Sequence, residues 1–154
     1  MKTNENNEIL NDLIRINNDR ATGYEKAARE TEAADQDLRS IFNSMASESH
    51  AYVSELSRYV MQSGEAPTDS TTVSGKIYRA WMDIKAAFTG KDRKSILESC
   101  EFGEDAAQKA YKETLQSDAG LRFSSDIREM ITRQKEKLKA SHDRIKLLRD
   151  AQPA

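Results

Sequence analysis

The chain has 154 residues, of which 32% are charged and 37% apolar, and its formal net charge is −2. This length fits one domain, covering residues 1–154, with enough apolar residues for a hydrophobic core. Acidic and basic residues are interspersed, so the chain lacks the basic face with which a dedicated nucleic-acid-binding protein displaces counterions from phosphates. No segment approaches the apolar length of a membrane span, and we therefore expect neither a nucleic-acid partner nor a membrane association.

The cysteine content limits the chemistry further. The single cysteine, Cys100, excludes an internal disulfide and every zinc or iron–sulfur site that needs several cysteines. One cysteine fits a reducing compartment. The first ten residues, MKTNENNEIL, contain no apolar run of signal-peptide length. We therefore expect a cytoplasmic protein.

Low glycine and proline contents, 6 and 2 residues, favour long helices over strands. The first predicted helix covers residues 6–31, where apolar side chains recur at helical spacing. Residues 32–37, EAADQD, interrupt this pattern, and Asp35 is the expected N-cap of a second helix. That helix is predicted to end near residues 63–70, SGEAPTDS, because this segment contains a glycine and a proline.

A long connector follows, over residues 63–92. Within it, residues 75–90 have the sequence GKIYRAWMDIKAAFTG, bounded by a glycine at each end. Apolar side chains recur there at intervals of four, three and four, at Ile77, Trp81, Ile84 and Phe88. This spacing predicts a short amphipathic helix over about residues 76–88 that packs against the other helices.

Two more helices complete the chain. The third is predicted to begin after Asp92, its expected cap, and to run to about Leu115. Residues 117–120, SDAG, supply the next turn. The fourth helix is predicted over about Ser124 to Arg149, where apolar residues again recur at helical spacing.

Four long amphipathic helices predict an all-α bundle. The link between the first and second predicted helices is short, and so is the link between the third and fourth. Each of these pairs is therefore expected to form an antiparallel hairpin. A helix of about a dozen residues spans about 18 Å, so the connector can travel the length of the bundle. We therefore predict a ferritin-like four-helix bundle, in which a long crossover containing a short helix joins two antiparallel hairpins.

Each long helix also carries a polar residue within its apolar face. These residues are Arg20, Ser49, Glu104 and Gln134 in chain order. The first two lie about half a helix from the first hairpin turn, and the last two lie about half a helix from the second turn. The four side chains are therefore expected to meet at one level inside the core and to form a buried polar layer.

Glu104 decides what this layer does. A carboxylate in the core must be paired, hydrogen-bonded, protonated or bound to a metal, because an isolated charge is too costly there. In one hypothesis Glu104 faces Arg20, and in the other it is a metal ligand. In the first case, further hydrogen bonds are expected from Gln134, Ser49, Tyr24 or Tyr111.

Four blocks of sequence are similar to a known family, in the same order. They are NNDRATGYEKAA at residues 17–28, AWMDIK at 80–85, ESCEFGEDAAQKAY at 98–111 and HDRIKLLRD at 142–150. They resemble a bacterial family of small ferritin-like four-helix-bundle proteins that is known only as a domain of unknown function. The resemblance covers about residues 9–150. It implies a ferritin-like fold and distant kinship to di-iron carboxylate proteins, and it implies no particular activity.

A di-iron site in such a bundle takes a glutamate from each of two helices and a Glu-x-x-His pair from each of the other two. The residues here that could bind a metal are Glu25, Glu101 and Glu104, with Glu48 and His142 as weaker choices. The third helix offers two glutamates three residues apart but no histidine, and Arg20 at the same level would repel a metal. We therefore expect no catalytic residue and no cofactor, with iron or another divalent metal as the alternative.

These observations favour a non-catalytic bundle in which the polar layer replaces the di-iron site. A homo-oligomer with a stress-related or housekeeping role is the corresponding expectation. The first alternative is an iron-binding protein or a metal-dependent oxidase. The second is an adaptor whose crossover helix binds a protein partner through Trp81.

Overall fold

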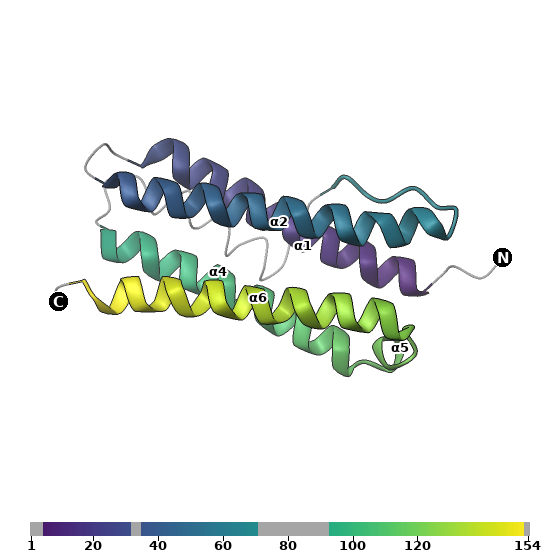
Figure 1. Ribbon diagram of the computed structural model, residues 1–154. Helices are drawn as coiled ribbons and strands as arrows, with labels where there is room; N and C mark the ends of the chain where they lie inside the picture. The colour runs from purple at the N-terminus through teal and green to yellow at the C-terminus, as the bar shows by residue number, and fades with distance from the viewer. Residues whose placement is uncertain (1–4, 32–34, 71–92, 153–154) are drawn as a thin grey trace.

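The computed structural model describes residues 5–31, 35–70 and 93–152, and every regular element within them is a helix. Four helices are long: α1 (Glu5–Glu30), α2 (Gln36–Gln62), α4 (Arg93–Gln116) and α6 (Ser125–Asp150). The short helix α5 (Asp118–Leu121) precedes α6. The all-α prediction is therefore confirmed for the described residues (Figure 1). None of these helices combines the length and the apolar character needed to cross a bilayer.

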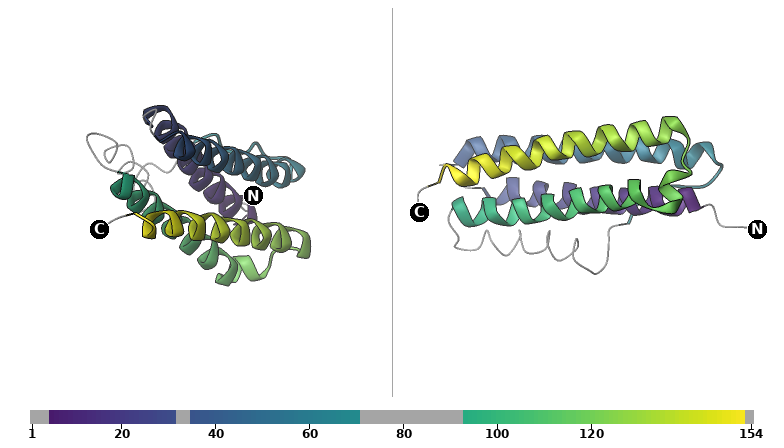
Figure 2. Two further views of the ribbon diagram at one scale, coloured as in Figure 1. Left: turned by 60° about the vertical axis from the view of Figure 1, so that its left-hand side comes forward. Right: turned by 90° about the horizontal axis from the view of Figure 1, so that it is seen from below.

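The long helices pack as two antiparallel pairs. Helix α1 packs extensively against α2, and α4 packs extensively against α6; Figure 1 shows the helices of each pair running in opposite directions. Because α1 also contacts α4 and α2 contacts α6, the pairs stack on each other, as the views in Figure 2 show. The end of α2 and the start of α4 lie at opposite ends of the stack. The predicted crossover helix at residues 76–88 lies outside the described residues.

The buried apolar side chains form two clusters along the stack. One contains Tyr24, Ala27, Ala28, Leu38, Ile41, Phe42, Met45, Ala46, Ile96, Leu97, Cys100 and Ile145. The other contains Leu10, Leu13, Ile14, Ile16, Tyr52, Leu56, Val60, Ala107, Tyr111, Phe123, Met130, Ile131 and Leu138. Full burial of a leucine-sized side chain stabilises a fold by about 1.5–3 kcal/mol, so these clusters supply the main driving force for folding. Along α1, α2 and α4, the buried polar residues Arg20, Ser49 and Glu104 lie between the two clusters.

Serine side chains cap the N-termini of the last two helices, α5 and α6. The Ser124 hydroxyl accepts a hydrogen bond from the backbone nitrogen of Ile127 at 3.3 Å and caps α6. The Ser117 hydroxyl accepts from the backbone nitrogen of Gly120 at 2.9 Å and caps α5. The turn predicted at SDAG therefore contains a short helix of its own, because a serine before an acidic residue provides the acceptor that a helix start needs.

Arg93, the first residue of α4, connects this helix to the start of α2. Its Nη1 donates to Asp35 Oδ1 and to Asp37 Oδ1, each at 3.0 Å, and its Nη2 donates to Asp37 Oδ2 at 2.5 Å. The predicted cap Asp35 occupies the N-cap position, but its side chain makes no capping hydrogen bond and pairs with Arg93 instead. The hydrogen bond from Arg93 lowers the pKa of Asp37 from 3.8 to about 2.

Gly120 is the position in the α5 turn where a side chain does not fit. A Cβ atom there would lie 1.9 Å from the backbone oxygen of Thr114. Gly120→Ala must therefore displace backbone, and we expect it to lower the free energy of unfolding by about 1–3 kcal/mol in urea denaturation. The control is Leu121→Ala, at an exposed position of the same turn, which should change stability by about 0.5 kcal/mol or less. Equal midpoints for the two variants would contradict this packing.

The pKa of Asp37, measured by NMR, is expected to rise from about 2 towards 3.8 in the Arg93→Gln variant. Because the folded pKa is the lower one, this carboxylate contributes stability above its unfolded pKa, and the contribution is lost as the pH falls from 3.8 towards 2. The control is Arg133→Gln, another surface arginine, which should leave the Asp37 pKa near 2. If the pKa of Asp37 were the same in Arg93→Gln as in the wild type, the pairing of these two residues would be refuted.

Candidate functional site

The guanidinium of Arg20, on α1, lies in the middle of the core with 0% of its side chain exposed. Its Nε donates to Glu104 Oε1 at 2.5 Å, and its Nη2 donates to Oε2 of the same carboxylate at 3.1 Å. Glu104, on α4, is 1% exposed. Two parallel hydrogen bonds between a planar guanidinium and a carboxylate form the arrangement of an ionised pair. This pair joins α1 to α4 across the core.

Helix α2 satisfies the remaining donors of Arg20. Nη1 donates to Ser49 Oγ at 2.8 Å and to the Met45 carbonyl oxygen at 3.2 Å. Nη2 also lies 2.9 Å from Glu48 Oε1, and that oxygen accepts a hydrogen bond from the Ser141 hydroxyl of α6 at 2.9 Å. Each of the five N–H bonds of a guanidinium therefore has an acceptor, and the positive charge faces two carboxylates.

A chain of hydrogen bonds continues from this pair towards α6. Ser49 Oγ donates to Asn17 Oδ1 at 2.9 Å, and Asn17 Nδ2 donates to the Tyr111 hydroxyl at 2.8 Å. The Tyr111 hydroxyl donates to Gln134 Oε1 at 2.7 Å. Each of these side chains is buried. The layer therefore contains side chains from all four long helices.

Helix α6 contributes two side chains to this layer, Gln134 and Ser141. Sequence reasoning placed Gln134 at the level of Glu104, but the α6 residue whose side chain meets the surroundings of Arg20 is Ser141, about two turns further on. Gln134 connects to the layer through Tyr111, and its Nε2 donates to Glu55 Oε1 at 3.1 Å.

Tyr24 is one of the two tyrosines that were expected as possible hydrogen-bond donors to Glu104. In the structure its ring contacts the guanidinium of Arg20. The Cζ atom of Arg20 lies 5.3 Å from the centroid of the Tyr24 ring. The same ring packs against Phe42, with centroids 5.6 Å apart. A guanidinium over an aromatic face gains a cation–π attraction that grows when both groups are desolvated.

Burial shifts the pKa values of several groups in this region. It raises the pKa of Glu104 above 4.5, and the charge and hydrogen bonds of Arg20 offset part of that increase. Burial is the largest single influence on Arg20 and acts to lower its pKa, but the charge and hydrogen bonds of Glu104, with the charges of Tyr24 and Glu48, together outweigh it, so the pKa is raised. Burial also raises the pKa of the Cys100 thiol. This thiol therefore stays protonated at neutral pH and acts as a small apolar residue, because only a thiolate is an effective nucleophile.

The residues considered as iron ligands lie in three different places. Glu25 Oε1 is 3.3 Å from His50 Nε2 on the exposed surface. Glu104 and Glu48 both bind Arg20 in the core. The remaining two candidates, a glutamate of α4 and a histidine of α6, belong to a separate group of charged side chains.

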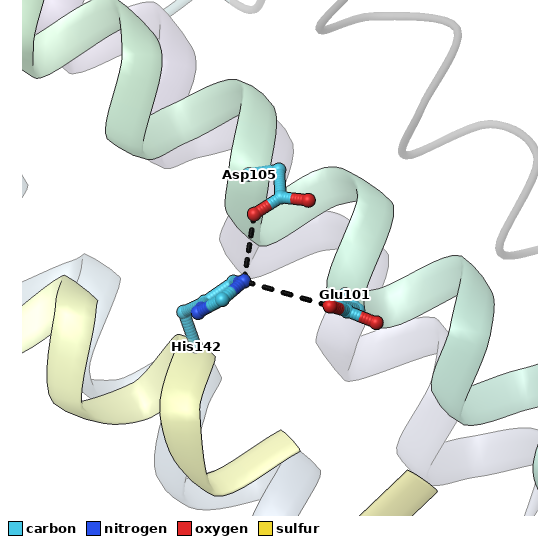
Figure 3. Close-up of side chains that lie close together, drawn as sticks. All are labelled: Glu101, Asp105 and His142. Carbon is cyan, nitrogen blue, oxygen red and sulfur yellow. Dashed lines mark ion pairs between the residues drawn. The ribbon is translucent and has the colours of Figure 1, made fainter. Parts of the chain in front are cut away.

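This second group lies between α4 and α6 (Figure 3). His142 Nε2 is 2.6 Å from Asp105 Oδ1 and 3.8 Å from Glu101 Oε1. His142 Nδ1 is 3.1 Å from Asp143 Oδ1, and the other oxygen of Glu101 pairs with Arg149. Sequence reasoning named Glu101 and His142 but missed Asp105. The signal that could have found it is its spacing of four residues after Glu101, which places both on one face of α4.

A surface pocket of about 520 Å³ adjoins this group. It is lined by Lys94, Glu98, Glu101, Phe102, Asp105, Arg149 and Asp150. Both signs of charge line the pocket, and Glu101 and Asp105 are among the lining residues. The side chains of Glu101 and Asp105 are therefore at least partly exposed to solvent, in contrast to that of Glu104.

Together, these contacts define an all-helical protein built around a buried arginine–carboxylate layer. A sequence model of a family described as a domain of unknown function, DUF2383, matches residues 5–117. The match covers more than half of the chain, so the protein belongs to this family. The resemblance to a domain of unknown function is therefore confirmed for the three sequence blocks within residues 17–111, and the block at residues 142–150 lies outside the match. The matched segment includes Arg20, Glu48 and Glu104 but not α6. No curated protein and no solved structure matches the chain.

Glu104→Gln removes the main counter-charge of Arg20, and we expect it to lower the free energy of unfolding by about 3 kcal/mol. Breaking a buried ion pair costs about 3–5 kcal/mol, and Glu48 keeps part of the pairing here. Chemical denaturation with circular dichroism measures the loss. The control is Asp12→Asn, which breaks the surface pair with Arg15 and should cost no more than about 1 kcal/mol.

The double variant Arg20→Met/Glu104→Leu separates the ion pair from the packing. Removing both partners leaves neither charge unmatched in the core, so we expect the double variant to be less destabilised than the sum of the two single variants. Glu48 can turn to solvent in this variant, because a quarter of its side chain is already exposed (25%). Additive losses would indicate that Arg20 and Glu104 do not act as a pair.

Proposed function

We propose that this protein is a non-catalytic, ferritin-like four-helix bundle in which an arginine takes the central position that metal ions hold in di-iron proteins. The observation that carries the proposal is the complete set of acceptors around Arg20, which includes carboxylates from α2 and α4. The role of this layer is to hold the helices in register, and the protein acts through its surface.

The helix arrangement supports the ferritin-like part of the proposal. Helices α1 and α2 form one antiparallel pair, and α4 and α6 form the other. Because α2 ends and α4 begins at opposite ends of the stack, these two consecutive long helices run in the same direction. Two hairpins joined so that the second and third long helices run in the same direction distinguish ferritin-like bundles from bundles with up-down-up-down topology.

The chemistry of the centre argues against a di-iron site at this level. Such a site needs several carboxylates that are free to bind metal and usually two histidines. Here Glu104 and Glu48 already neutralise Arg20. A metal ion beside the guanidinium would be repelled by about 4 kcal/mol per unit charge at 4 Å, for an effective dielectric constant near 20. Arg20 would therefore have to leave the core before iron entered it.

A homo-oligomer in a stress-related or housekeeping role remains part of this proposal. Four large apolar side chains are exposed on the described surface, at Met61, Phe102, Leu121 and Leu147. Exposed apolar side chains favour contact with another protein surface when they are grouped, but scattered ones are common on monomers. Light scattering on the purified chain measures the oligomeric state directly.

Aerobic addition of iron(II) tests the non-catalytic centre. We expect iron(II) to oxidise at the same rate with the protein as in buffer, and we expect Glu104→Gln and Glu48→Gln to leave that rate unchanged. His142→Ala is the matched control for iron that binds between α4 and α6. Two equivalents of iron with accelerated oxidation, both lost in Glu48→Gln and retained in His142→Ala, would overturn the proposal. Glu48→Gln is the informative variant if Glu104→Gln does not fold.

A further inference from the structure

The group formed by Glu101, Asp105 and His142 lies outside the Arg20 layer and serves no part of the function proposed above. One oxygen from each carboxylate and one imidazole nitrogen lie within 4.8 Å of one another. Glu101 and Asp105 are four residues apart on α4, and His142 faces them from α6 (Figure 3). The three side chains therefore converge on one point between two helices.

The hydrogen bonding of the imidazole indicates which nitrogen faces that point. Nδ1 lies 3.1 Å from the Asp143 carboxylate, which can only accept a hydrogen bond when ionised, so this contact favours the tautomer with a proton on Nδ1. Nε2 faces the other two carboxylates, is shielded from solvent, and makes no hydrogen bond within the described structure. Its contact with Asp105 at 2.6 Å is close but is not aligned as a hydrogen bond. Nε2 and two carboxylate oxygens directed at one point form an arrangement that a bound cation would complete.

The neighbours of these three groups orient them in the way that supporting residues orient metal ligands. Asp143 holds the imidazole from the far side, as in carboxylate–histidine–metal arrangements. Lys139 holds Asp143 in turn, with Nζ donating to Oδ2 at 2.8 Å. Arg149 pairs with one oxygen of Glu101 and leaves the other oxygen towards His142. Each of these contacts leaves the inward-facing atom free.

We propose that Glu101, Asp105 and His142 bind a divalent transition-metal ion of the zinc class, through Oε1, Oδ1 and Nε2. A mixed set of one imidazole and two carboxylates suits zinc and its neighbours better than calcium or magnesium, which prefer oxygen ligands alone. Three protein ligands leave a fourth position open, and the adjoining pocket of about 520 Å³ is where water or a small anion would complete the coordination.

The distances require only a local adjustment. Metal–ligand bonds of about 2.0–2.1 Å place the ligand atoms of a tetrahedral site about 3.3 Å apart. The contact between Asp105 and His142 therefore has to open slightly from 2.6 Å, and that between Glu101 and His142 has to close slightly from 3.8 Å. Asp105 is free to move, because 62% of its side chain is exposed. His142 stays in place, since only 15% of its side chain is exposed.

Calorimetric titration of the full chain with zinc chloride tests this site. We expect one equivalent of zinc to bind and the midpoint of thermal unfolding to rise with zinc concentration, because the metal joins α4 to α6. His142→Ala should weaken binding more than tenfold, and Asp105→Asn should weaken it measurably. The matched control is His50→Ala, which removes the other histidine of the chain and should bind zinc like the wild type.

A second measurement keeps the proposal testable if His142→Ala folds poorly. In the intact protein, one equivalent of zinc should shift the nitrogen NMR signal of His142 Nε2 and leave that of His50 unchanged. The proposal is overturned if His142 retains protons on both nitrogens at neutral pH in the presence of excess zinc, or if wild type and His142→Ala bind zinc equally. Neither result bears on the centre of the bundle, whose test depends on Glu48 and Glu104.

Discussion

The ion pair between Arg20 and Glu104 places one charge of each sign in the middle of an apolar core, where an unmatched charge costs most. The surrounding residues follow from that placement. Nη1 needs the Ser49 hydroxyl and the Met45 carbonyl, and Nη2 is shared between two carboxylates. The two apolar clusters supply most of the stabilisation, but they would tolerate small shifts of one helix along another. The layer between them does not.

A helix that slid by one turn would move its side chains by about 5.4 Å, well beyond hydrogen-bonding distance. Such a shift of α4 would separate Glu104 from Arg20, and a shift of α2 would remove Ser49 and Glu48 from the guanidinium. Either shift leaves a buried charge without a partner. The layer therefore favours one register of the helices over its neighbours, which is the best-supported use of polar groups inside helical bundles.

The helices and part of the layer could be predicted from the sequence, because the rotation per residue determines which face of a helix is buried and the rise per residue determines the height of each side chain. That reasoning places Arg20, Ser49 and Glu104 in the core, where the structure has them. It does not specify side-chain rotamers at the edge of a face, so it could not show that Glu48 is a second acceptor for Arg20. Nor could it single out Asp105 among many exposed carboxylates, since only the packing of α4 on α6 brings it to His142.

The division of the layer between the two hairpins has a consequence for assembly. The α1–α2 hairpin contains Arg20 together with Glu48, whereas the α4–α6 hairpin contains Glu104. Separated from the first hairpin, the second hairpin would expose Glu104, whose carboxylate is otherwise buried beside the positive charge of Arg20. An α1–α2 half from another copy of the chain would satisfy it equally well, so exchange of hairpins between molecules preserves every contact of the layer and offers a route to intertwined dimers.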